Sequence, residues 1–472
     1  MTYDAVVVGS GPNGLAAAIR LAQADLSVLV LEAHSHIGGG TRTVELTKPG
    51  YLHDVCSAVM PFAEHSAAFR AMPLREHGLE WLYSDSEVAH PLDGGGARFI
   101  YHDIARTADA LGTDAADYSS LFGRLAPDAD DIFSYAMGPM LRLPHHPWKL
   151  ARFGLAALMS ADRFASRYDE PGSQALFAGV AAHAVQPFSQ ATSASVGLAM
   201  MVAAHAYRWP LPRGGATSVT TSMASYFASL GGTIETDRRI RTASDFPATR
   251  LKLLSSTPTA LASIFGLAEP RWNYGPGAFK IDWALDGPIP WKNTEVGGAS
   301  TVHVGGSYEE IAAAEKTVHH GGHPDKPYVL VTQPTNVDAT RAPSGKHVAW
   351  GYCHVPNGSD VDMVDGIETQ IERFAPGFRD QIIAKHVKPP GWYTDYNDTY
   401  VGGDIGAGAF TPRQMFGRPK LSPNPYSTPI DGVFLCGAST APGAGVHGMA
   451  GWNAAAAALK SLGIEPTPRT GR

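Results

Sequence analysis

The chain has 472 residues, of which 44% are hydrophobic and 17% are charged, and its formal net charge is −7. This length allows two or three domains with a large core, and the composition is typical of a soluble globular protein. The acidic balance excludes the basic surface of a nucleic-acid-binding protein. The chain opens on a buried-type strand without a basic leader. No apolar stretch reaches the roughly 18 residues of a membrane-spanning helix, so we expect neither a secretory signal nor a spanning segment.

The three cysteines, Cys56, Cys353 and Cys436, lie far apart and form no CxxC pair. A flavin disulfide reductase needs two adjacent thiols to pass electrons, so this class is excluded. The cysteine usage is consistent with a reducing cytoplasm, which is the compartment that we expect.

The first 32 residues form one complete nucleotide-binding pattern. An apolar strand precedes the turn Gly9-Ser10-Gly11-Pro12-Asn13-Gly14, and a small-residue helix over 15–24 and a second strand over 27–31 follow it. Gly9 permits the tight turn, Gly11 lets a pyrophosphate approach the backbone, and Gly14 lets the helix pack close to the strand. Glu32, 18 residues after Gly14, is placed to bind a ribose diol. Its charge disfavours the 2′-phosphate of NADP.

A glycine-rich loop, Ile37-Gly38-Gly39-Gly40-Thr41-Arg42-Thr43, follows Glu32 by a few residues. Its backbone N–H groups and the Arg42 guanidinium are suited to a phosphate. An ordinary loop after a strand is the alternative, but the position favours the ligand-binding interpretation.

From about Ala71 to Ala204 the pattern changes to helical segments rich in Ala, Leu, Phe and Met. The most apolar part, Ile132 to Ser160, also carries Arg142, Lys149 and Arg152. It could line an apolar substrate tunnel, rest on a membrane surface, or form a helix pair of the core with a basic rim. The sequence does not separate these three interpretations.

The α/β pattern returns in the middle and at the end of the chain. After Arg213-Gly214-Gly215 we predict a helix over 218–230 and strands over 233–236 and 251–255. Further strands are predicted over 278–285, 328–332 and 347–354. A buried strand over 432–437 precedes a last Ala-rich helix. We therefore predict an α/β fold with a Rossmann-like domain built from residues 1–70, 205–270 and 405–472. Residues 71–204 and 271–404 would form an inserted mixed α+β substrate domain with a helical, apolar insertion.

These motifs together resemble the phytoene desaturase and amine oxidase superfamily of FAD-dependent oxidoreductases, and more closely its phytoene desaturase-like branch. The resemblance rests on VVVGSGPNGLAAA with LEA at Glu32, on GGGTRT, PRGG and GGTIETDRRI, and on FLCGASTAPGAGVHGMAG at the end of the chain. Any one of these motifs could occur by chance, but their order and spacing are specific for the fold and for FAD.

The resemblance implies a set of FAD-binding residues. Glu32 would hold the adenosine ribose, Arg42 would lie near the diphosphate, and Ile240 would present its backbone to the adenine. The helix start at the end of the chain would face the flavin pyrimidine ring, where negative charge develops on reduction. The predicted cofactor-binding residues are Gly9, Gly11, Pro12, Asn13, Gly14, Glu32, Ala33, Gly39, Gly40, Thr41, Arg42, Ile240, Gly437, Gly445, Val446, His447 and Met449.

The candidate catalytic residues are Lys280, His447 and His53. By the resemblance, Lys280 would contact flavin N5 through a water, and the stretch around His53 would lie near the flavin; a surface lysine and a strand cap are the alternatives. No cysteine occurs at the usual covalent-flavin position of some amine oxidases, so we expect noncovalent FAD. The tyrosine-rich stretch 393–400 could supply an aromatic pocket wall or only turns.

Other chemistry is less well supported. Two groups of histidines lie in Gly- or Pro-containing runs, which indicate solvated loops rather than metal sites. They are His319, His320 and His323, and the pair His145-His146. A second complete GxGxxG unit is absent. We therefore expect O2, a quinone or another acceptor in place of a resident NAD, although transient NAD(P) binding stays open.

We predict an FAD-dependent oxidoreductase, a desaturase or dehydrogenase that passes a hydride from a C–H bond of an apolar small molecule to flavin N5. The alternatives are an amine oxidase that forms an imine and hydrogen peroxide, and a non-catalytic binding protein for lipidated partners. We expect a cytoplasmic protein, with peripheral membrane contact possible. The substrate, acceptor and oligomeric state stay open.

Overall fold

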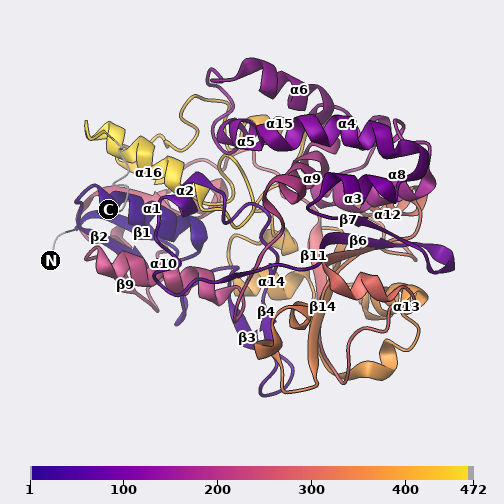
Figure 1. The fold of residues 1–472 in the computed structure, drawn as a ribbon. Coiled ribbons are helices and arrows are strands. Elements are labelled where there is room, and N and C mark those ends of the chain that lie inside the picture. Colours follow the sequence, from indigo (N-terminus) through magenta and orange to yellow (C-terminus); the bar gives the residue numbers. More distant parts are fainter. Residues whose placement is uncertain (1–2, 466–472) are drawn as a thin grey trace.

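The computed structural model describes residues 3–465, whose strands form a five-stranded sheet, a seven-stranded sheet and two two-stranded sheets (Figure 1). The five-stranded sheet has the order β16-β10-β1-β2-β9, and every neighbouring pair is parallel. Its strands are β1 (Tyr3–Val8), β2 (Val28–Leu31), β9 (Thr233–Glu235), β10 (Thr249–Leu254) and β16 (Val433–Leu435). The predicted Rossmann-like sheet is confirmed, with strands drawn from three distant stretches of the chain.

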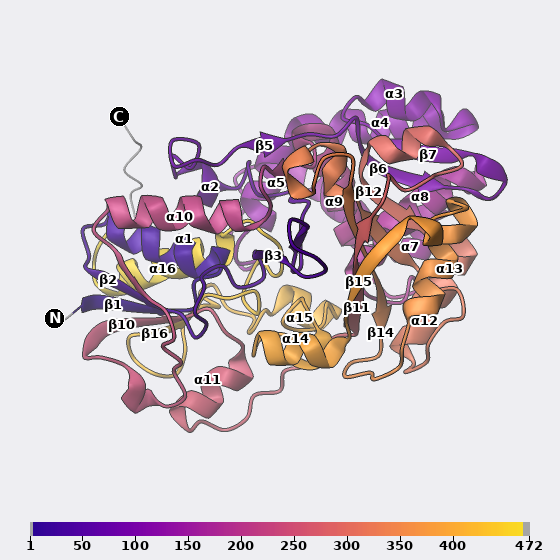
Figure 2. The ribbon, with the colours of Figure 1, turned by 90° about the horizontal axis from the view of Figure 1, so that it is seen from below.

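Helices α1 (Pro12–Gln23), α10 (Thr217–Ser229) and α16 (Met449–Ser461) cover one face of this sheet (Figure 2). On the other face, α11 (Pro258–Phe265) contributes Leu261 to a small cluster with Leu254 and Val433. Helix α1 begins at Pro12, earlier than the sequence predicted, because proline is well tolerated in a first helical turn. A Cβ atom at Gly451 of α16 would overlap the Asn13 carbonyl of α1, so the two helices depend on this glycine for their close contact.

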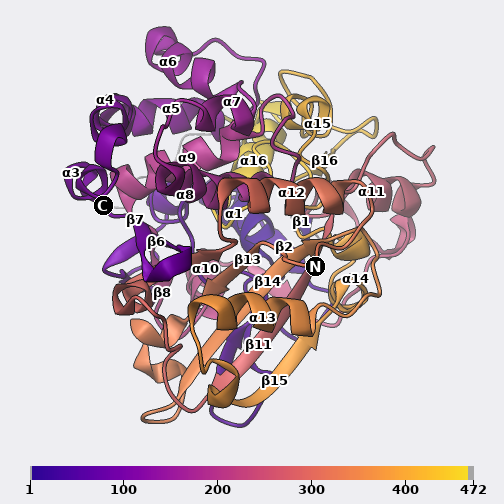
Figure 3. The ribbon, with the colours of Figure 1, turned by 90° about the vertical axis from the view of Figure 1, so that its right-hand side faces the viewer.

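The seven-stranded sheet is mixed, with the order β15-β11-β14-β13-β12-β6-β7; only β12 and β6 are parallel. Its strands are β6 (Ser86–Pro91), β7 (Ala97–Ile100), β11 (Gly277–Leu285), β12 (Ala299–Val304), β13 (Val329–Thr332), β14 (His347–Val355) and β15 (Ile382–Lys388). One face packs Phe279, Ile281 and Trp283 against helix α13 (Val364–Phe374), as Figure 3 shows for the ribbon. By the period of two in a strand, Lys280 and Asp282 lie on the opposite face.

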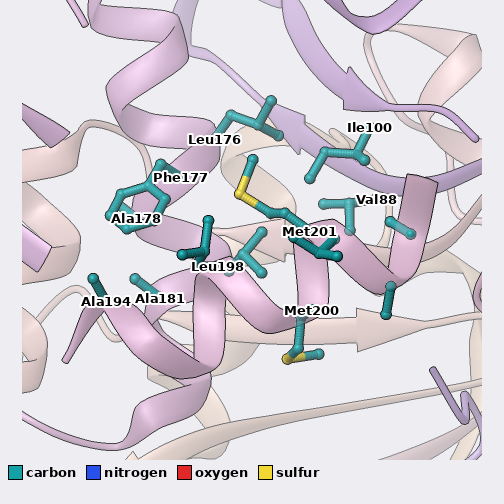
Figure 4. Packing of buried hydrophobic residues seen from close by; sticks show 14 of the residues in the cluster. Val88, Ile100, Leu176, Phe177, Ala178, Ala181, Ala194, Leu198, Met200 and Met201 are labelled. Carbon is teal, nitrogen blue, oxygen red and sulfur yellow. The ribbon is translucent and has the colours of Figure 1, made fainter. Parts of the chain in front are cut away.

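A group of helices covers that opposite face. Figure 4 shows part of their core, in which Leu176 and Phe177 of α8 and Leu198 and Met201 of α9 pack beside Val88 of β6. The helices of this part are α3 (Ile104–Asp109), α4 (Ala115–Leu125), α5 (Ala129–Ala136), α6 (Pro147–Ala157), α7 (Ala161–Ala165), α8 (Pro171–Ala181), α9 (Ala194–Tyr207) and α12 (Tyr308–His319).

The shorter elements are β3 (Thr43–Glu45) paired with β4 (Leu52–Asp54), β5 (Trp81–Leu82) paired with β8 (Leu211–Pro212), and the helices α2 (Ala67–Arg70), α14 (Pro390–Tyr396) and α15 (Pro412–Phe416). The stretch 71–204 therefore contains β5, β6 and β7 besides its helices, which the sequence did not predict. Strand β6 is buried throughout but carries Ser86, Glu87 and His90, so it lacks the apolar run that marks a buried strand.

Among residues 3–465, no helix combines the length and the apolar character that a membrane crossing requires. Over the same range, no group of three or more His, Cys, Asp or Glu side chains is arranged to hold a metal ion.

Candidate active site

A single large cavity of about 1420 Å³ reaches from the five-stranded sheet to the inner face of the seven-stranded sheet. The glycine turn after β1, the end of β2 and the loop before α16 line one end. The other end is enclosed by side chains of α5, α6, α9, β13 and β14, most of them apolar. One cavity thus joins the predicted nucleotide site to an apolar chamber.

Glu32 lies at the end of β2 and is almost fully buried. One carboxylate oxygen accepts hydrogen bonds from the Ser10 N–H (3.0 Å) and the Ser10 hydroxyl (2.6 Å), and the other accepts one from the His34 N–H (2.9 Å). Gly9 has a φ of 94°, and a Cβ atom on Gly14 would overlap the Gly9 carbonyl, so both glycines have the roles that the turn requires. The carboxylate is held in a fixed orientation on the cavity wall.

Arg42 supports this wall. Its guanidinium lies 3.4 Å from Glu32 and donates to the carbonyls of Ile37 (3.0 Å) and His36 (2.5 Å). It also lies over the ring of Tyr396, 5.3 Å from the centroid. Arg42 lines the cavity, but much of its hydrogen-bonding capacity is used within the protein.

The tyrosine-rich stretch packs on the glycine loop. The Tyr396 hydroxyl donates to the Gly39 carbonyl (2.6 Å), and a Cβ atom at Gly40 would overlap the Tyr400 hydroxyl. Tyr393, Tyr396 and Tyr400 all line the cavity, so the sequence was right to consider this stretch as an aromatic wall.

The loop before α16 closes the same end of the cavity. Helix α16 begins at Met449, and Val446 and His447 precede it, separated from it by Gly448 with a φ of 66°. The Met449 N–H donates to His447 Nδ1 (3.1 Å), which caps the helix and leaves the ring hydrogen of the neutral imidazole on Nε2. Burial lowers the pKa of His447 to about 4, so the ring is neutral at neutral pH.

Most of the predicted cofactor residues share this cavity. Those that line it are Gly9, Gly11, Pro12, Asn13, Glu32, Ala33, Gly39, Gly40, Thr41, Arg42, Ile240, Gly445, Val446 and His447. Gly14, Gly437 and Met449 lie behind the wall. A Cβ atom at Gly437 would lie 2.9 Å from the Ser256 nitrogen, so this glycine serves the packing of β16 beside the end of β10.

Lys280 lines the cavity from β11 and belongs to a buried cluster of charges. Its ammonium donates to the Asp54 carbonyl (2.9 Å) and to Asp282, and lies 4.8 Å from the centroid of the Trp350 ring. Lys388 also pairs with Asp282, at 2.7 Å. Burial, against the attraction of Asp282, lowers the pKa of Lys280. The alternative of a surface lysine is wrong.

His53 lies behind Lys280 and does not line the cavity. Its Nδ1 is 3.9 Å from Asp282, and its Nε2 contacts the Thr47 hydroxyl at 2.8 Å. Burial lowers the pKa of His53 to about 4. In this place His53 has no contact with the cavity and can affect it only through the charge cluster.

Helix α6 borders the apolar chamber, where Leu150, Phe153 and Leu158 line the wall. The same segment leaves large apolar side chains in solvent: Leu143, Trp148 and Leu155 are 93%, 84% and 72% exposed. Leu155 belongs to both groups. The stretch 132–160 therefore lines a cavity and also presents an apolar outer surface.

Several side chains of the chamber were not predicted from the sequence, among them His183, Trp350, Tyr352 and His354. The last three alternate along β14, so a period of two in the predicted strand was a signal for their shared face. His183 lies in a short turn after α8 and had no local signal.

Comparisons with known proteins agree with this geometry. A family model described as an NAD(P)-binding Rossmann-like domain matches residues 7–72. Pyridine nucleotide-disulfide oxidoreductase domain-containing protein 2 of Mus musculus is 25% identical, over 98% of this chain and 94% of the relative. The neurosporene-forming phytoene desaturase of Rhodobacter capsulatus is 23% identical, over 95% of this chain and 92% of the relative. A structure of putrescine oxidase bound to putrescine has a TM-score of 0.60 at 16% identity, over 98% of this chain and 99% of that one.

The fold and the site thus define a Rossmann-type oxidoreductase with a cavity that extends from the nucleotide site. The predicted resemblance to the phytoene desaturase and amine oxidase superfamily is confirmed to this extent: the chain has a Rossmann-like dinucleotide-binding domain, its relatives include a phytoene desaturase, and putrescine oxidase shares its fold. All three cysteines are free thiols, so despite the name of the mouse relative the dithiol of a disulfide reductase is not present here.

Proposed function

We propose that this protein binds FAD noncovalently and desaturates an apolar small molecule, with O2, a quinone or another acceptor receiving the electrons. The observation that carries the proposal is the continuity of the cavity, which connects Glu32 and the glycine turn to the apolar chamber past Lys280 and His447. A bound flavin would supply the hydride acceptor, N5, for a substrate C–H bond.

The residues present fit this cofactor. Gly11 caps α1 without a side-chain hydrogen bond, so the first N–H groups of the helix are open to a diphosphate. The side-chain oxygen of Asn13 is buried without a partner. A Cβ atom at Gly39 would lie 3.2 Å from the Gly11 Cα atom, so the two loops approach more closely than side chains would allow. Glu32 would bind the ribose, and Ile240 would border the adenine.

The chain itself would orient the substrate, exclude water and supply positive charge. When Lys280 is protonated, the two lysines at Asp282 give this cluster more cationic than anionic groups, and Lys280 is the one at the cavity surface. Burial lowers the pKa of Lys280 to about 7, so this positive charge is present below about pH 7. A cation at this place favours the negative charge that develops on a reduced flavin. It would repel a protonated amine.

This repulsion is why we favour a desaturase or dehydrogenase over an amine oxidase, the second candidate, whose support is the shared fold of putrescine oxidase. An amine substrate calls for an acidic or aromatic partner. The nearby Asp282 is already paired with two lysines, whereas the aromatic wall of Tyr393, Tyr396 and Tyr400 could receive an amine and keeps this candidate second. A non-catalytic binding protein for lipidated partners is the third candidate, and it would not need a flavin.

The apolar surface of α6 at the chamber suggests how an apolar substrate enters. We propose that Trp148 and Leu155 rest on a membrane surface, while the protein is otherwise cytoplasmic. The neighbouring Lys149 and Arg152 pair with carboxylates of the protein, so the contact would be mainly apolar. The alternative is that α6 is an exposed helix that does not contact a membrane.

The test is anaerobic reduction of the purified protein. We expect flavin absorbance in the protein as isolated and bleaching on addition of an apolar isoprenoid, but none with diamines or monoamines. Bleaching by amines alone, with peroxide formed in air, would establish the amine oxidase instead. Protein that takes up no flavin even when FAD is added would refute both enzymes.

A further inference from the structure

The apolar chamber contains one polar corner, formed by two histidines from distant elements. His354 projects from β14, and His183 comes from the turn Ala182–Ala184 that follows α8; both line the cavity, and a positive charge on His354 is close enough to lower the pKa of His183. Apolar side chains such as Leu330, Met200 and Trp209 line the same cavity, and the Tyr352 ring lies 5.6 Å from that of His354. Two ring nitrogens that face such a surface need a polar partner.

The first histidine has a fixed orientation. The Nδ1 atom of His354 lies 2.8 and 3.0 Å from the two oxygens of Glu315, whose side chain is 3% exposed. An ionised carboxylate only accepts hydrogen bonds, so the ring hydrogen is assigned to Nδ1. In the neutral form of this ring, the Nε2 atom is then a hydrogen-bond acceptor for a ligand.

The second histidine, His183, presents a hydrogen-bond donor. The Nε2 atoms of His183 and His303 are 3.0 Å apart, and the Nδ1 atom of His303 is buried without a partner. Burial lowers the pKa of His183 to about 3 and that of His303 well below its ordinary value, so both rings are neutral. Because an orphaned N–H is rarer than an orphaned acceptor, the hydrogen of His303 is assigned to Nε2. His183 therefore accepts that bond and carries its own hydrogen on Nδ1.

The backbone beside His183 is strained. The turn ends at Val185, whose φ of 51° is a left-handed conformation that a β-branched residue rarely adopts. Val185 lines the cavity as well. Strain of this kind concentrates at binding sites, where it fixes a side chain in place.

An acceptor and a donor at one corner match a hydroxyl group, which has one hydrogen to give and lone pairs to receive. A carboxylate fits less well, because Glu315 already places a negative charge against His354 and a second buried anion would lack a cation of its own. Lys280 and Lys388 are committed to Asp282.

The corner extends away from Lys280 across the sheet. Lys280, Tyr352, Leu330 and His303 are paired in one row across β11, β14, β13 and β12. At roughly 4.8 Å for each strand step, this row spans roughly 14 Å. His354 is a diagonal neighbour of Lys280, roughly 8 Å away. A hydroxyl bound in the corner would therefore be separated from the reacting C–H bond by several carbon atoms.

We propose that the substrate is a long apolar alcohol, whose terminal hydroxyl donates to His354 Nε2 and receives the His183 N–H directly or through a water. This inference rests on the proposed function and names its substrate class. The hydroxyl is an anchor and is not oxidised; the bond that becomes a double bond lies farther along the apolar chain. One of its carbons would give a hydride to flavin N5, the neighbouring carbon would give a proton to solvent, and the electron acceptor would reoxidise the flavin.

The test is equilibrium binding to the FAD-loaded protein, followed by quenching of tryptophan fluorescence because Trp209 and Trp350 line the cavity. The probes are geranylgeraniol, its methyl ether, which cannot donate a hydrogen bond, and the corresponding carboxylic acid. We expect the alcohol to bind about tenfold more tightly than the ether, as one net hydrogen bond provides, and more tightly than the acid.

Variants separate this role from a structural one. In His354→Phe and His183→Phe the preference for the alcohol over the ether should fall to about one. Glu315→Gln, whose amide oxygen can still accept from Nδ1, should keep part of it. His319→Phe, the same change at an exposed histidine outside the cavity, should leave the preference unchanged. Flavin content and the thermal unfolding midpoint show that each variant is folded.

Equal binding of alcohol and ether by the native protein would overturn the inference, and so would tighter binding of the acid. A preference that survives in both histidine variants would also overturn it. If the protein holds FAD and shows no preference, only this inference fails. If it takes up no FAD, the proposed function fails, whatever the probes show.

Discussion

Replacement of Glu32 by glutamine tests the assignment of the nucleotide site. In the native protein the carboxylate accepts three hydrogen bonds from Ser10 and His34 and still faces the cavity. Glutamine keeps the shape and one acceptor oxygen but loses the charge. A hydrogen bond to a charged group contributes about 1.5–3 kcal/mol, so loss of one ribose contact should weaken FAD binding by about 10- to 150-fold.

The assay is titration of the apoprotein with FAD, followed by quenching of flavin fluorescence. FMN is the internal control, because it lacks the adenosine ribose and should bind equally to the native protein and to the variant. Ser10→Ala is the matched variant, since it removes a partner of Glu32 and leaves the carboxylate in place. If Glu32→Gln bound FAD as tightly as the native protein, or lost FMN affinity to the same degree, the assignment of Glu32 to the ribose would be refuted.

Three further predictions concern the charge cluster, the helix contact and the buried histidines. Lys280→Met should slow anaerobic flavin reduction by roughly 100-fold in stopped-flow absorbance, whereas Lys346→Met, at a partly exposed lysine outside the cavity, should not. An unchanged rate in Lys280→Met would remove Lys280 from the mechanism. Gly451→Val should lower the free energy of unfolding by at least 1–3 kcal/mol in urea titrations, because its side chain would overlap α1; an unchanged midpoint would contradict the close contact. Burial lowers the pKa of His205 and of His447 to about 4, below about 6.5 in the unfolded chain. The unfolded state therefore binds more protons in this window, and stability should fall as the pH falls from 7 to 5, by about 2 kcal/mol for each such ring; a flat profile in urea titrations would be the contrary result.

The parts of the site that could be predicted from the sequence are those encoded locally. The turn from Gly9 to Gly14 and the acid at Glu32 belong to one short pattern, because each residue's role depends on neighbours within that pattern. Lys280 was indicated by the resemblance alone. The Asp54 carbonyl that it contacts and the Lys388 that shares Asp282 with it come from other parts of the chain. Strand β6 was missed because its polar side chains are satisfied by residues distant in sequence, as when His90 contacts the Gly306 carbonyl at 2.8 Å.

The polar corner shows the same limit. His183 and His303 are 120 residues apart, and no spacing rule relates them. His354 could have been placed on one face of β14 by its alternation with Tyr352 and Trp350. The orientation of its ring, however, depends on Glu315 of helix α12. These histidines are brought together by tertiary packing, which cannot be predicted from composition or periodicity.

The contact between α1 and α16 has a consequence for synthesis of the protein. The turn that opens the nucleotide site is made long before α16 and the preceding loop, which close the same site. Strand β1 likewise acquires its neighbour β10 only after the helical stretch 71–204 has been made. Such distant pairings are slow to form. The five-stranded sheet therefore stays incomplete until β10 and β16 have been made. We expect the cofactor to bind only after that, when the fold is complete.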